Sequence, residues 1–145
     1  MNIHKGLVIL LMIICVSVVI YNYFLQSSKG NKTCQTHKYQ YTVIQKTIVN
    51  NSFSLLTADS ISKQTYGLMN IKNRKDICEA DGMIFRFPFS TPQSFWNKDT
   101  LVDLDVYWMR GDKVIEKTNL PAISKGFRMI SSPSAVDTVV EIIQQ

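Results

Sequence analysis

The fold is decided by the stretch Phe95-Trp96-Asn97-Lys98-Asp99-Thr100-Leu101-Val102-Asp103-Leu104-Asp105-Val106-Tyr107-Trp108-Met109. It contains both tryptophans of the protein, and its second half alternates in the way that β-strands do. One face would carry Val102, Leu104, Val106 and Trp108, and the other Leu101, Asp103, Asp105, Tyr107 and Met109. The stretch therefore predicts one long β-strand, whose carboxylates lie either on the solvent side of a sheet or at a site.

Outward from this stretch, the chain alternates between short apolar segments and turns. Segments rich in β-branched and aromatic residues predict further strands at 41–49, 53–58, 83–89, 114–117 and 138–143. Pro88 cannot donate to a ladder, so its strand should end or lie at an edge there. Asp59-Ser60 would cap a short helix at 61–66, which Gly67 would end.

These elements predict a mainly β domain, a small barrel or sandwich with one or two short helices. The candidate core consists of Phe53, Leu55, Met83, Phe85, Phe87, Leu101, Val102, Leu104, Val106, Val114, Val140 and Ile142. At this chain length, most of the aromatic residues must contribute to the core rather than to a ligand groove.

The N-terminal segment predicts the location of the protein. Residues 6–28 contain no charged side chain, and roughly 20 apolar residues are enough for one helix to cross a membrane. Bulky residues stand where a cleavage site needs small ones, and Tyr21 and Tyr23 suit a membrane interface. We therefore expect an uncleaved transmembrane signal-anchor (1–25), a polar tether (26–40) and a β-rich domain (41–145). A cleaved signal peptide is the alternative.

Charge and cysteine content narrow the function further. The net charge of +5 is spread along the chain rather than clustered, so no nucleic-acid partner is expected. Cys34 and Cys78 could form one disulfide in an oxidising compartment, or remain free thiols. We expect no metal site, because Cys34, His37 and Cys78 are fewer than the four ligands of structural zinc. No cofactor is expected, since the chain has no glycine-rich phosphate loop.

Three segments, taken in order, carry a family resemblance: Gly67-Leu68-Met69, Asp81-Gly82-Met83-Ile84-Phe85, and Phe95-Trp96-Asn97-Lys98-Asp99-Thr100 with Leu104-Asp105. Together they resemble the bacterial and archaeal family called domain of unknown function 192, over about residues 41–143. The resemblance implies a compact β-rich domain, often behind an export signal or a membrane anchor, and no established activity. Asn97 stands where the family has methionine, and Asp99 where it has asparagine. The sequence ends at Gln145, before a glycine-containing segment of many members, which leaves barrel closure open.

The candidate ligand site combines Trp96, Lys98, Asp99, Thr100 and Asp105. An indole offers a stacking face and an ammonium group binds anions, so a saccharide or an acidic ligand would suit this site. We therefore expect a membrane-anchored domain on the periplasmic or extracellular side of the cell membrane, which binds a small ligand, a saccharide or an envelope partner.

Two other function classes stay open. Asp103 and Asp105, roughly 7 Å apart on one strand face, could flank a glycosidic bond in an envelope hydrolase. Asp105 could equally fix the loop while Asp103 faces water. A serine–histidine triad is not expected, because His37 is the only histidine outside the anchor region. The third class is an accessory subunit of a membrane complex. The sequence favours a binding domain over an enzyme.

Overall fold

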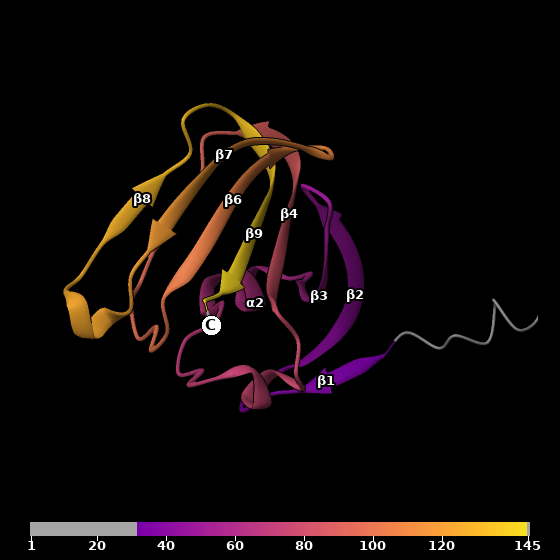
Figure 1. Ribbon diagram of the computed structural model, residues 1–145, viewed down its shortest axis with the longest axis vertical. Coiled ribbons are helices and arrows are strands. Elements are labelled where there is room, and N and C mark those ends of the chain that lie inside the picture. The colour runs from indigo at the N-terminus through magenta and orange to yellow at the C-terminus, as the bar shows by residue number, and fades with distance from the viewer. Residues whose placement is uncertain (1–31, 145) are drawn as a thin grey trace, which may run out of the picture. The chain divides into compact units, whose positions relative to one another are not determined.

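The protein is described here by a computed structural model, which covers residues 32–144; the predicted anchor (1–25) lies outside this range. One seven-stranded sheet forms the framework (Figure 1). Its order is β1 (Thr33–Gln35), β2 (Gln40–Ile48), β3 (Asn51–Ala58), β4 (Gly82–Thr91), β9 (Val136–Ile143), β6 (Leu104–Arg110) and β7 (Lys113–Leu120). All neighbours are antiparallel except β3 and β4, which are parallel. The mainly β class is therefore confirmed.

Short elements complete the domain. A two-stranded ribbon joins β5 (Ser94–Trp96) to β8 (Met129–Ser131). The helical elements are α2 (Ile61–Tyr66), η1 (Arg74–Ile77) and η2 (Ile123–Lys125), the last two being single 3₁₀ turns. None of the helices between residues 32 and 144 is long and apolar enough to cross a membrane.

Both faces of the central strand β9 are buried. The first face packs Met83, Phe85, Val106 and Trp108 against apolar residues of the segment between α2 and β4, including Leu68 and Ile77. The second face carries a separate cluster of Ile48, Leu55, Ile84, Met109, Val140 and Ile142. Within the predicted core, Leu101 is the exception, because its side chain is exposed.

The second face is buried because the sheet curls over it. Lys46 of β2 and Asp112 of the β6–β7 turn form an ion pair of 2.7 Å, and the rings of Phe53 and Tyr107 are 6.4 Å apart. Figure 1 shows the β2–β3 hairpin and the β6–β7 hairpin bending toward each other. Over the described residues no closed barrel is found: β1 and β7 remain the edges of an open sheet. The predicted barrel is therefore replaced by a curled sheet whose first face is covered by helical turns and the β5–β8 ribbon.

The predicted long strand at 95–109 is divided into β5 and β6, which belong to different sheets. Two polar residues explain the break. The buried Asn97 bonds to backbone groups of a distant loop, and Asp99 adopts a left-handed conformation with φ of 53°, which asparagine and aspartate tolerate better than most residues. From Leu104 onward the predicted alternation holds, with Leu104, Val106 and Trp108 on the first face.

Several local predictions agree with the structure. Ser60 caps α2 by accepting a hydrogen bond from the Lys63 N–H, and Gly67 ends the helix with φ of 54°. Pro88 lies where the ladder between β4 and β9 is interrupted, although β4 itself continues to Thr91. At the other end, β1 extends the folded domain into residues predicted as tether, because the compact unit begins at Thr33.

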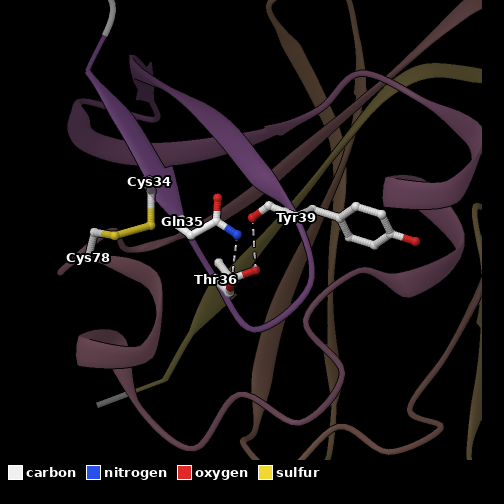
Figure 2. The surroundings of a disulfide bond; sticks show 5 residues. All are labelled: Cys34, Gln35, Thr36, Tyr39 and Cys78. Carbon is white, nitrogen blue, oxygen red and sulfur yellow. Dashed lines mark hydrogen bonds between the residues drawn. A yellow bond between two sulfur atoms is a disulfide. The ribbon is translucent and has the colours of Figure 1, made fainter.

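Cys34 and Cys78 form a disulfide, with Cα atoms 5.9 Å apart (Figure 2). The bond joins β1 to the residue that follows η1. Beside it, the β1–β2 turn is closed by hydrogen bonds that the N–H and hydroxyl of Thr36 donate to the Tyr39 carbonyl. The short edge strand β1 is thus held to the domain both by its ladder with β2 and by a covalent bond.

Candidate functional site

A pocket of about 460 Å³ opens on the first face of the sheet. Its walls come from α2 and the three residues after it, from β4, and from β5 with the loop that follows. One residue each of β8 and β9 completes the lining. The volume falls within the range of small-molecule sites.

The segments that carry the family resemblance meet at this pocket. Gly67-Leu68-Met69 forms one wall, Phe85 contributes from β4, and the lining residues of the 95–100 segment are Phe95, Trp96, Lys98 and Thr100. These segments are separated in sequence and come together only through the fold. The sequence analysis placed the candidate site only in the 95–105 segment, and it did not predict that the Gly67 segment and Phe85 face the same space.

The aromatic walls combine packing with access to solvent. Phe95 lies edge-on to Phe85, with ring centroids 4.9 Å apart, and to the buried Trp108, at 5.7 Å. Trp96, by contrast, is 43% exposed although it lines the pocket. Lys98 is also exposed and forms no ion pair within residues 32–144. An indole and an ammonium group thus remain available to a ligand.

Asn97 and Asp99 position these walls without lining the pocket themselves. The Asn97 amide donates to the carbonyls of Pro121 and Gly126, both at 2.8 Å, and its oxygen accepts from the Arg128 N–H at 2.8 Å. The carbonyl of Asp99 accepts from the Asn70 N–H at 2.8 Å. This last bond joins the loop after β5 to the loop after α2, so two walls of the pocket are held together.

Glu141 is the site residue that sequence reasoning missed. It lies on β9, the central strand between β4 and β6, opposite Met83 and Val106. Its side chain lines the pocket but is only 4% exposed, and it makes no hydrogen bond or ion pair with any described residue. Burial raises the pKa of the Glu141 carboxyl from 4.5 to about 8.

The Glu141 carboxyl lies beneath the wall formed by the Gly67 segment. A Cβ added to Gly67 would stand 4.0 Å from Glu141 Oε2 and 3.8 Å from Phe85 Cζ. The sequence held one signal for this residue: it is the only acid in the apolar run Val139-Val140-Glu141-Ile142-Ile143. Glutamate is rarely buried unless it is paired, so an acid in such a strand indicates a site.

The remaining predicted site residues do not line the pocket. Asp103 accepts hydrogen bonds from the Lys125 ammonium group and the Ala122 N–H, and these bonds lower the pKa of its carboxyl. Asp105 pairs with Lys117 at 2.7 Å and accepts from the Gln144 side chain at 2.7 Å. Both carboxylates therefore fix neighbouring chain segments, the role that the sequence left open for Asp105.

Fold and pocket together define a small β-rich domain with a ligand-sized pocket on the first face of its sheet. The chain belongs to the DUF192 family, described as "Uncharacterized ACR, COG1430", whose pattern matches residues 42–145. This match confirms the resemblance that the three motifs indicated. Comparison with curated proteins gave no match.

Two crystal structures show a similar fold. A protein of unknown function from Novosphingobium aromaticivorans DSM 12444 is 23% identical, with a TM-score of 0.57, over 79% of this chain and 87% of that one. The second, from Sinorhizobium meliloti 1021 and described as a "putative transcription regulator", is 21% identical, with a TM-score of 0.55, over 77% of each chain. At these identities the likeness concerns the fold alone.

Proposed function

We propose that this protein is a membrane-anchored, exported domain that binds a small organic ligand in the pocket beside Trp96. The observation that carries the proposal is the convergence of three separate motifs on one pocket, whose lining includes an exposed indole and a buried carboxyl that has no partner among residues 32–144. A purely structural core would bury the indole and exclude the carboxyl. The arrangement is that of ligand sites, which combine apolar walls with few polar groups.

The proposed location rests on two features at the start of the chain. The uncharged run at 6–28 is long enough for a single membrane span. The Cys34–Cys78 disulfide suits the oxidising side of that membrane. A tether that begins near residue 26 would keep the pocket close to the membrane surface.

The hydrolase alternative receives no such support. A retaining or inverting glycosidase needs two carboxyl groups that both face the substrate. Here Asp103 and Asp105 are each bonded to a lysine and lie outside the lining of the pocket. Between a hydrolase and a ligand-binding domain, the geometry of the described residues supports the ligand-binding domain.

Replacement of Trp96 by alanine tests the proposal. The full-length protein is purified from membranes of its native host, and retained small molecules are identified by untargeted mass spectrometry. We expect Trp96→Ala to lose the ligand retained by the unaltered protein, because the ligand loses its stacking surface. Its melting temperature should change by only a few degrees, since the side chain is already 43% exposed.

Phe89→Ala is the matched control, because Phe89 is a large aromatic residue that is 76% exposed and does not line the pocket. This variant should retain the ligand. The proposal is wrong if Trp96→Ala retains the same molecules as the unaltered protein. It is also wrong if the variant unfolds at room temperature, because Trp96 would then belong to the core.

A further inference from the structure

Glu141 indicates which chemical class of ligand the pocket takes. We propose that the site selects a hydrophobic amine, whose ammonium group pairs with the Glu141 carboxylate while its apolar body lies against the aromatic walls. This inference rests on the proposed function, since it assumes that the pocket binds a small molecule. It goes against the acidic ligand that Lys98 suggested from the sequence alone.

The first argument is the missing partner of the carboxyl. Glu141 is 4% exposed, and the residues opposite it on both neighbouring strands, Met83 and Val106, are apolar. Buried carboxylates in proteins are normally paired with a cation or hydrogen-bonded. Within residues 32–144 no side chain supplies that partner, whereas the pocket gives a ligand access to it.

The second argument is the nature of the surrounding walls. Tyr66, Phe85, Phe87, Phe95 and Trp96 all line the pocket. Aromatic faces attract organic cations, and do so more strongly where water is excluded. The same faces bury the hydrocarbon part of a ligand. An ammonium group on an aryl or alkyl body therefore satisfies both the carboxylate and the walls, which a neutral or anionic ligand would not.

Lys98 does not conflict with this assignment. Its side chain is exposed on the loop after β5, whereas Glu141 is buried on the central strand. Lys98 and Tyr66 are the other titratable residues of the pocket, and β4 and β6 contribute none. Lys98 thus lies where it can contact a polar or anionic group at the outer end of the ligand, while the inner end remains selective for a cation.

Three matched probes test the inference by calorimetric titration of the full-length protein in lipid nanodiscs, with empty nanodiscs as the blank. They are 2-phenylethylamine, neutral 2-phenylethanol and anionic 3-phenylpropionate. At pH 8.5 we expect the amine to bind at least about tenfold more tightly than the other two, because it alone forms the ion pair. Between pH 6 and 8 its affinity should rise by up to about tenfold per pH unit as Glu141 ionises. Binding of the alcohol should not rise.

Glu141→Gln assigns these effects to one residue, since Lys98 and Tyr66 are unchanged in it. The variant should lose the preference for the amine and its pH dependence, and still bind 2-phenylethanol. Glu116→Gln is the matched control, because Glu116 is exposed on β7 and outside the pocket; it should behave as the unaltered protein does.

The inference is overturned if the alcohol or the acid binds as tightly as the amine, or if Glu141→Gln retains amine selectivity. A carboxyl that stays protonated and donates to a neutral ligand would give the first result. The proposed ligand-binding function is tested separately from the amine selectivity. If the native ligand depends on Trp96 but lacks a basic nitrogen, only the amine selectivity is refuted. If no retained ligand depends on Trp96, both the amine selectivity and the ligand-binding function are refuted.

Discussion

Removal of the Cys34–Cys78 disulfide should lower the stability of the domain substantially. The bond joins positions 44 residues apart in sequence, so it restricts the unfolded chain across β2, β3, α2 and η1. The double variant Cys34→Ala/Cys78→Ala removes it without leaving buried thiols. Cys15→Ser provides a suitable background for both proteins, because it prevents exchange with the third cysteine of the chain.

The size of the effect follows from the length of the closed loop. For a separation of 44 residues, the chain-entropy relation gives a loss of about 4 kcal/mol at 25 °C. In a domain of this size, each kcal/mol changes the melting temperature by about 4 °C. The variant should therefore melt about 15 °C below its parent, with the fold of the remaining sheet retained, since β1 contributes only a short edge strand.

Circular dichroism measures this difference directly, with thermal unfolding of parent and variant followed under identical conditions. Reduction of the parent with a phosphine should reproduce most of the loss, whereas the same reagent should leave the double variant unchanged. A difference below about 3 °C would refute the reasoning, because it would mean that the unfolded chain is not restricted by this bond. Two free thiols at Cys34 and Cys78 in the non-reduced parent would refute its premise.

Three further predictions concern the strands and loops around the pocket. Asn97→Ala should lower the free energy of unfolding by about 2–4 kcal/mol, and hydrogen exchange should become faster at the Arg128 amide, which loses its acceptor. Gly82→Ala should prevent normal folding, seen as loss of soluble protein, because its Cβ would lie 1.8 Å from the backbone oxygen of Glu141. Glu141→Gln should unfold at higher urea than the unaltered protein at pH 8 but not at pH 4.5. The folded carboxyl keeps its proton up to about pH 8, so the unaltered protein loses up to about 1.4 kcal/mol per pH unit between these values.

Helix ends, turns and strand alternation were the features of the fold that could be predicted from the sequence. Ser60 and Gly67 bound α2 because a hydroxyl cap and a positive φ are determined by the residue itself. The turn at Gly111, with φ of 57°, is local in the same sense, because glycine adopts a positive φ without steric cost. The alternation from Leu104 to Trp108 also survived, because the period of a strand depends on the adjacent residues alone.

Long-range partners were the part that could not be predicted. Asn97 is buried because its amide forms hydrogen bonds with backbone groups that lie 24 to 31 residues away in sequence. No local sequence pattern predicts such a contact. The continuous strand expected through 95–109 failed for this reason. Barrel closure could not be predicted for the same reason, because it requires that β1 and β7, which are far apart in sequence, pair with each other. In the structure they do not pair, and the sheet buries its second face by curling.

The candidate site shows the same division between local and long-range information. Of the residues predicted for the site, Trp96, Lys98 and Thr100 line the pocket, whereas Asp99, Asp103 and Asp105 do not. Alternation correctly separated Asp105 from the face of Leu104 and Val106, but it could not reveal that Lys117 and Gln144 engage that carboxylate. Glu141 could not be assigned to the site from the sequence, because only the pairing of β9 with β4 and β6 places its side chain behind the Gly67 segment.

Glu141 argues that this pocket is more than a packing defect. An apolar residue at its position would extend the cluster formed by Val106, Val139 and Ile143 on the same face. It would also avoid the cost of burying an acid that has no partner between residues 32 and 144. The Asn97 amide donates to the Pro121 carbonyl, and the Asp99 carbonyl accepts from the Asn70 N–H, so the loops beside the pocket are fixed in place. Residues that oppose the stability of a fold while their surroundings hold a space open are characteristic of sites selected for binding. The buried acid on the central strand is therefore better explained by the proposed ligand site than by the packing of the fold.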